Sequence, residues 1–114
     1  DSMNFPMLTG ISAAQLMAPD QAMRKQIREA VRLSDLMVQR SYQVSELHFD
    51  APDRLVVFTN EFPVALHMGW GNWEDKLSRL GRLMTLWKGH EERLASLDMS
   101  FSDQVVARLR RADH

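Results

Sequence analysis

The sequence contains no cysteine, and this absence excludes disulfide bonds, thiolate zinc sites and a cysteine nucleophile. It also has little net charge, because 14 Lys and Arg residues nearly balance 15 Asp and Glu residues. A near-neutral chain has no general attraction to nucleic acid or to anionic membranes. Long apolar runs are missing too, and none approaches the ~20 residues that a membrane-spanning helix needs.

What is present is typical of a folded domain. The 114 residues are 45% apolar and 25% charged. A disordered chain has fewer apolar residues and a larger net charge, and a chain of this length has room for one hydrophobic core. We therefore expect residues 1–114 to form a single domain.

The N-terminal part of the chain predicts one long helix after an irregular start. Residues 5–11 are apolar but are broken by Pro and Gly, which indicates an extended lead-in. Ser12 can cap a short helical turn that Pro19 ends. Asp20 is a suitable N-cap for a helix over 21–40, where apolar residues recur at steps of three and four.

A second amphipathic helix is predicted over residues 72–88. Asn72 is its candidate N-cap, and Asp75 follows three residues later, as in a capping box. Its narrow apolar seam consists of Trp73, Leu77, Leu80, Met84 and Trp87. Gly81 interrupts the helix, and a close approach to the sheet would be one reason for a glycine there.

Five other segments have the composition or alternation of strands. They are 44–50, 55–58, 64–68, 96–101 and 105–109. The expected element order is α-β-β-β-α-β-β. This order predicts an α+β fold with two amphipathic helices packed on one face of a mostly antiparallel five-stranded sheet.

The sequence has no pattern typical of a catalytic, metal or cofactor site. The run His90-Glu91-Glu92-Arg93-Leu94 begins like a zinc-protease motif, but leucine stands where the second histidine ligand is required. Phosphate-binding glycine motifs and the G-x-S-x-G motif are also missing. We therefore expect a protein that is not an enzyme and binds no cofactor.

A nucleic-acid-binding module is the alternative function, because helix, three strands and helix is the order of double-stranded-RNA-binding domains. Such domains contact the phosphate backbone and need basic residues where the second helix begins. Here Glu74 and Asp75 occupy that place, and acidic residues repel phosphate. A small basic cluster of Arg108, Arg110 and Arg111 lies near the C-terminus.

The last predicted strand, 105–109, has no later element to cover it. If it lies at the sheet edge, its free backbone groups can pair with a strand from another protein. Arg108 can serve either as a charge that blocks unwanted pairing or as a binding residue. A proline at an outward-facing N–H would test this edge, with Val106→Pro as first choice and Val105→Pro as the register control.

Several fragments together resemble the periplasmic β-domain of the bacterial cell-division protein FtsQ, called DivIB in other bacteria. The resemblance covers about residues 5–109. The first match is the run Phe5-Pro6-Met7-Leu8-Thr9-Gly10, which is similar to the family pattern "LPVLTG". The second is Leu66-His67-Met68-Gly69 with Lys76, Leu77 and Leu80, which is similar to "LxLG…KL..L". The third is Leu97-Asp98-Met99-Ser100-Phe101 followed by Val105-Val106-Ala107-Arg108-Leu109, which is similar to "iDLRY/F.d.vav".

The resemblance implies a non-catalytic scaffold of the divisome, the machinery that builds the septum. FtsQ-type proteins are bitopic inner-membrane proteins with one transmembrane helix, a periplasmic POTRA domain and then this β-domain. The first two segments would lie outside the present chain. The resemblance also implies a periplasmic location and FtsB-like and FtsL-like partners, with FtsB adding a strand to the last strand of the β-domain.

The resemblance also assigns candidate partner-binding residues. Phe101 matches an aromatic of the partner-binding ending, and Leu109 lies near a tryptophan of some members. Asp103 occupies a small polar position, and Arg54 is placed like an arginine on an earlier strand. Ser100 departs from the family, since many members have an arginine there that pairs with an acidic residue of FtsB. The full set is Arg54, Ser100, Phe101, Asp103, Val105, Val106, Arg108 and Leu109.

Overall fold

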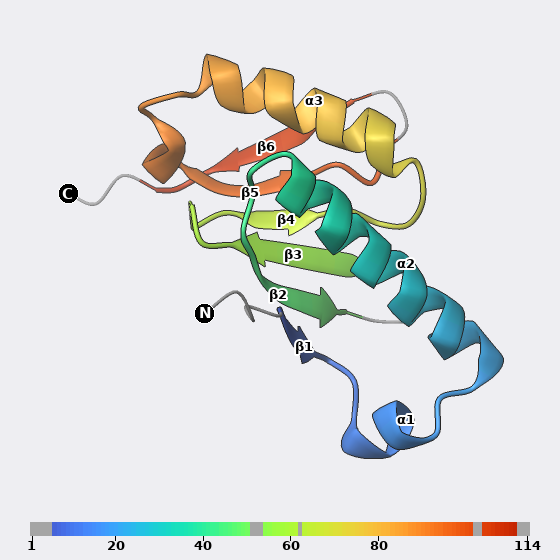
Figure 1. Cartoon of the computed structure of the whole chain (residues 1–114). Coiled ribbons are helices and arrows are strands. Elements are labelled where there is room, and N and C mark those ends of the chain that lie inside the picture. The colour runs from blue at the N-terminus through green and yellow to red at the C-terminus, as the bar shows by residue number, and fades with distance from the viewer. Residues whose placement is uncertain (1–5, 51–53, 62, 102–103, 112–114) are drawn as a thin grey trace.

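The computed structural model describes residues 6–50, 54–61, 63–101 and 104–111 of the chain. In this part, three α-helices and six strands form two layers, as Figure 1 shows. In chain order the elements are β1 (Met7–Thr9), α1 (Ala13–Met17), α2 (Gln21–Gln39), β2 (Val44–Phe49), β3 (Leu55–Thr59), β4 (Ala65–His67), α3 (Trp73–Leu86), the 3₁₀ helix η1 (Glu91–Arg93), β5 (Leu94–Asp98) and β6 (Val106–Leu109).

The strands lie side by side in the order β1-β2-β3-β4-β5-β6, the same order as in the sequence. The β1–β2 and β4–β5 pairs are parallel, and the three other pairs are antiparallel. The predicted α+β class is therefore confirmed. The predicted five strands and the order α-β-β-β-α-β-β are wrong, because the sheet is mixed and has a sixth strand. The short helical turn expected after Ser12 is confirmed as α1, and the hydroxyl of Ser12 caps it by accepting a hydrogen bond from the N–H of Gln15.

The additional strand, β1, lies inside the segment expected to be an irregular lead-in. Pro6 and Gly10 enclose a run of three strand residues, which is too short for alternation to be visible in the sequence. The strand forms because it pairs in parallel with β2, where Thr9 lies opposite His48. The side chains of this pair also meet, with Oγ1 of Thr9 2.7 Å from Nδ1 of His48.

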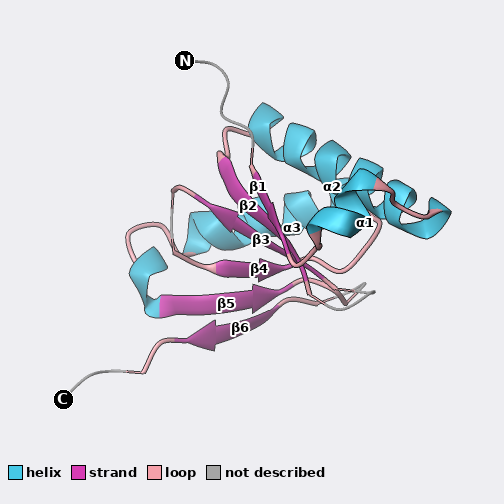
Figure 2. Ribbon diagram, turned by 90° about the horizontal axis from the view of Figure 1, so that it is seen from below, coloured by secondary structure: helices cyan, strands magenta, loops and turns pink. Residues whose placement is uncertain are grey.

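The long helices α2 and α3 cover one face of the sheet, as expected, and Figure 2 shows both on the same side. Asp20 caps α2 as predicted, since its carboxylate accepts a hydrogen bond from the N–H of Met23 at 2.8 Å. The two helices are joined by an ion pair between Arg40, just after α2, and Glu74 in α3, at 2.8 Å. The order of layers is therefore helices, core and sheet.

The core lies between this helical layer and the sheet. Every strand from β2 to β5 directs alternate apolar side chains into it. The residues with no exposed surface include Leu33 and Met37 of α2, Leu80 of α3, and Leu47, Val57, Leu66 and Leu97 of the strands. The opposite face of the sheet has no helix over it in the described part of the chain, and Figure 2 shows it open.

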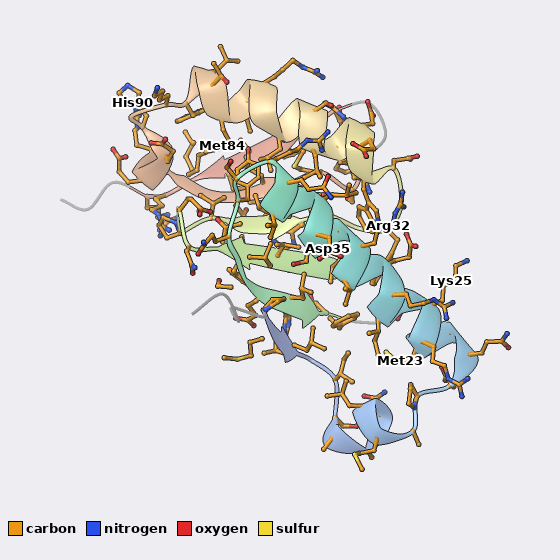
Figure 3. The ribbon with its side chains drawn as sticks, in the orientation of Figure 1. Met23, Lys25, Arg32, Asp35, Met84 and His90 are labelled. Carbon is orange, nitrogen blue, oxygen red and sulfur yellow. The ribbon has the colours of Figure 1, made fainter. Side chains whose placement is uncertain are left out.

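The start and the seam of α3 differ in part from the prediction. Asn72 is the N-cap, but it has a left-handed backbone (φ 54°) and its side chain makes no capping hydrogen bond. Trp73, Leu77 and Leu80 of the predicted seam are buried. Met84 and Trp87 are only partly buried, because the C-terminal end of α3 extends beyond the core. Figure 3 shows Met84 between this end of the helix and the sheet.

Candidate functional site: the β6 edge of the sheet

β6 is the last strand of the sheet, and in the described part of the chain no strand pairs with its outer side. All four of its residues are exposed, with Leu109 at 53% and Val106 at 40%. An exposed edge strand presents unpaired N–H and C=O groups, which can pair with another chain. The prediction that the last strand lies at the sheet edge is confirmed.

The register of β6 against β5 decides which of its backbone groups are free. The N–H of Arg110 donates to the carbonyl oxygen of Arg93 at 2.8 Å, so this group is directed toward β5. Successive residues of a strand direct their N–H groups to opposite sides. Arg108 and Val106, at steps of two from Arg110, therefore also direct their N–H groups toward β5.

The backbone groups of Ala107 and Leu109 are consequently directed away from the sheet. They are the groups of β6 that a further strand would pair with. The choice of Val106→Pro as a probe of an outward N–H is therefore wrong, since that N–H is directed toward β5. The error has a simple cause: alternation in the sequence shows two sets of residues but does not show which set is bonded inside the sheet.

A hollow of about 520 Å³ lies beside this edge on the sheet face opposite the helices. Three of the predicted site residues, Arg54, Ser100 and Arg108, line it, although they come from three separate segments of the chain. The other lining residues are Leu55, His67, Gly69, Ser96 and Asp98. The sequence analysis did not select His67 and Asp98, which adjoin only because β4 and β5 pair in parallel.

Among the described residues that line the hollow, Asp98 is the one acidic residue. Its Oδ1 accepts two hydrogen bonds from Ser100, one from the backbone N–H at 3.0 Å and one from the hydroxyl at 2.6 Å. Partial burial acts to raise the pKa of Asp98, but these hydrogen bonds and the nearby His67 and Arg108 outweigh burial and lower it. Ser100 thus holds a carboxylate in its charged form beside Arg108.

The other predicted site residues that the structure describes do not line the hollow. Phe101 is 44% exposed, and its carbonyl oxygen accepts a hydrogen bond from Nη1 of Arg79 at 3.0 Å. Val105 is partly buried and packs against the core. Leu109 lies on the opposite side of β6, the side that faces the helices. Asp103 lies outside the described residues.

Lys76 supports the wall of the hollow and was not selected from the sequence. Only 2% of this residue is exposed, and its Nζ donates to the carbonyl oxygen of Met68 at 2.6 Å. A second, longer contact joins Nζ to the carbonyl oxygen of Trp70 at 3.4 Å. The ammonium group therefore holds both sides of Gly69, which lines the hollow. A lysine at an inward-facing position of a helix is the signal that could have indicated this role.

Two smaller hollows lie elsewhere on the described surface, one of about 450 Å³ beside α3 and one of about 350 Å³ at the start of α2. None of the described helices is long and apolar enough to cross a membrane. Within the same residues, no group of three or more His, Asp or Glu side chains is placed to hold a metal ion. The basic residues Lys25 and Arg32 lie on α2, away from β6 (Figure 3), and α3 begins with the acidic Glu74 and Asp75.

The molecule is thus a two-layer α+β domain whose sheet ends in an uncovered strand beside a charged hollow. The chain is similar to the cell division protein FtsQ of Geotalea daltonii, with 25% identity over 112 residues. It is also similar to FtsQ of a Geobacter species (21% over 112 residues) and of Syntrophotalea carbinolica (26% over 113 residues). The predicted resemblance to FtsQ is confirmed.

These similarities cover 95–96% of this chain but only 40–41% of each relative. The chain therefore spans about two fifths of the length of the curated relatives it matches. No family model matches the chain.

Proposed function

We propose that this chain is an FtsQ-like interaction domain of the bacterial cell-division machinery, which accepts a β-strand from a partner protein along β6. The observation that carries this proposal is the exposed edge of β6, where Ala107 and Leu109 direct their backbone groups outward. The similarity to FtsQ over 95% of the chain supports the cell-division role. The role is that of a non-catalytic scaffold, because strand addition needs no chemical step.

Main-chain hydrogen bonds would supply much of the affinity in this mode of binding, and side chains would supply specificity. Two exposed apolar residues beside the edge are suited to anchor a partner: Val106 on one side of β6 and Leu109 on the other. Phe101 lies in the connection between β5 and β6, is 44% exposed, and is a third candidate. FtsB-like and FtsL-like proteins are the partners that the resemblance implies.

The charges around the hollow next to β6 favour a partner with an acidic side chain at this edge. Its described lining includes two arginines, Arg54 and Arg108, and one carboxylate, that of Asp98. An acidic side chain of the partner would therefore be attracted to it. The family places an arginine at the position of Ser100, and we propose that Arg108 takes over that contact here, because it lines the same hollow on the edge strand itself.

We also propose that this chain forms a single domain and lies in the periplasm as part of a bitopic inner-membrane protein. The whole protein would then include the transmembrane helix and POTRA domain of FtsQ. The support for this is the share of the relatives that the chain spans, about two fifths. A strand-accepting domain in that compartment would meet the periplasmic parts of its partners directly.

The test is amide hydrogen exchange, followed by NMR, with and without the periplasmic segment of the FtsB-like protein of the same organism. Binding by strand addition should slow exchange at Ala107 and Leu109, whose N–H groups are free. Exchange at Val106 and Arg108 should change less, since these groups are already directed toward β5. Leu8 of β1, at the other edge of the sheet, serves as the internal control. A segment that binds without protecting Ala107 and Leu109 would contradict the proposal.

A further inference from the structure

One side of α3 faces the β6 edge and is apolar in its C-terminal half. Arg79, Leu83 and Leu86 are separated by four and three residues, so they lie on the same side of the helix. Arg79 donates to the carbonyl oxygen of Phe101, which orients this side toward the connection between β5 and β6. Leu83 is partly buried, whereas Leu86 is 80% exposed.

Leu109 adds an exposed apolar side chain from the edge strand. It lies opposite Leu94 of β5, and directly opposed residues of an antiparallel pair point to the same face. Leu94 is fully buried beneath the helical layer, so Leu109 also faces the helices. Figure 1 shows that α3 and β6 end on the same side of the molecule, and Figure 3 places His90 at that corner. We call Leu83, Leu86 and Leu109 the leucine shelf.

The charges along the same edge are basic. Arg93, Arg108 and Arg111 are exposed, and none of them forms an ion pair within the described residues. Nη2 of Arg110 donates to the carbonyl oxygen of Pro63, which carries no formal charge. The nearby carboxylate of Asp98 offsets part of the charge of Arg108. A second copy of this chain pairing through β6 would bring two such basic rows together, and like charges oppose that contact.

We infer that α3 takes part in selecting the incoming strand, which is an acidic segment with apolar side chains at every second position. This inference rests on the proposed function and specifies its partner. A strand paired with Ala107 and Leu109 would direct alternate side chains toward the helical layer, where the leucine shelf is exposed. Apolar residues at those positions would bury Leu86 and Leu109, and acidic residues elsewhere in the segment would match the row of arginines.

The experiment compares Leu86→Gln with Val38→Gln in the 114-residue chain. Both residues are exposed and apolar, near the ends of α3 and α2 respectively, but α2 lies away from β6. Neither substitution adds charge, and thermal unfolding should stay close to that of the parent. Binding of the fluorescently labelled FtsB-like segment should weaken on the order of tenfold for Leu86→Gln, the loss of one buried apolar side chain. The control should stay within about twofold of the parent.

Hydrogen exchange at Ala107 and Leu109 separates failure of this inference from failure of the proposed function. If these amides are protected but Leu86→Gln binds like the parent, strand addition stands and the role of the leucine shelf is wrong. If they are not protected, both proposals are wrong. A second probe is the same segment with its apolar residues moved to consecutive positions at constant composition. It should bind more weakly than the natural order, and equal binding would overturn the requirement for alternation.

Discussion

The backbone nitrogen of Arg110 lies 2.8 Å from the carbonyl oxygen of Arg93, so the N–H of Arg110 is directed toward β5. It follows that Val106 and Arg108 have their N–H groups inside the sheet, while Ala107 has its N–H outside. Two neighbouring residues of one short strand therefore have opposite roles. One contributes to the stability of the domain, and the other is available to a partner.

Proline substitution should separate these two roles. Ala107→Pro removes a free N–H and places a ring in the path of an added strand, so partner binding should be lost while unfolding changes little. Val106→Pro removes a donor of the β5–β6 ladder and should lower the free energy of unfolding by about 1–3 kcal/mol. The measurements are urea unfolding and partner binding. If Ala107→Pro binds like the parent, the edge of β6 is not the binding surface.

Replacement of Gly81 or Gly69 by alanine should change the free energy of unfolding in opposite directions. A Cβ at Gly81 would meet no atom within 4 Å, so the expected close approach to the sheet is wrong. Gly81→Ala should therefore raise the free energy of unfolding by about 0.5–1 kcal/mol, because it improves helix propensity. Gly69 has φ +62°, and its Cβ would lie 3.1 Å from Cβ of Ser100, so Gly69→Ala should destabilise the fold. Urea unfolding of both variants checks the signs, and a destabilised Gly81→Ala would contradict this account.

Lys76→Met should destabilise the domain although it preserves the size of the side chain. The carbonyl oxygens of Met68 and Trp70 would lose their charged donor in a buried place, which costs about 1–3 kcal/mol. Lys88→Met, at an exposed position just after α3, is the matched control and should change stability by less than about 0.5 kcal/mol. Equal unfolding midpoints for the two variants would show that Lys76 does not hold the loop.

The lowered pKa of Lys76 predicts that the stability of the domain depends on pH in the alkaline range. Burial lowers the pKa of Lys76, and the nearby Arg79 lowers it further, while Asp98 acts in the opposite direction. Between the lowered pKa and the ordinary value of 10.5, the unfolded chain binds more protons than the folded chain. The free energy of unfolding should therefore rise with pH across this window. Lys76→Met should lack this rise, and an identical pH profile for parent and variant would contradict the assignment.

Ser100→Ala should raise the pKa of Asp98 toward its ordinary value, because the carboxylate loses a hydroxyl donor at 2.6 Å. In the parent the folded structure lowers the pKa of Asp98. The charged carboxylate therefore stabilises the fold at pH values above its ordinary pKa, and this stabilisation is lost as pH falls through the folded-state pKa. The stability difference between parent and variant should accordingly shrink in acid. NMR titration of the side-chain carboxyl carbon measures the pKa, and Ser78→Ala is an exposed serine control. An unchanged pKa would exclude Ser100 as the cause.

The sequence by itself determined the elements whose physical causes are local. The steps of three and four in 21–40, together with the cap at Asp20, predicted α2 to within one residue, because helix spacing and capping depend on nearby residues only. The same holds for the buried start of the seam, Trp73 to Leu80. The sequence also led to the expectation that the last strand lies at an edge, and the order of the strands in the sheet confirms it.

The tertiary structure alone decided the features that depend on partners distant in the chain. β1 is a strand only because β2 lies beside it, and its three residues have no pattern of their own. Arg54, His67, Asp98 and Arg108 share one hollow only because β3 to β6 lie side by side. The outward direction of Ala107 depends on how β6 pairs with β5. Alternation in a sequence defines two faces and two edges of a strand, but pairing with a neighbour is what assigns each of them to the inside or the outside.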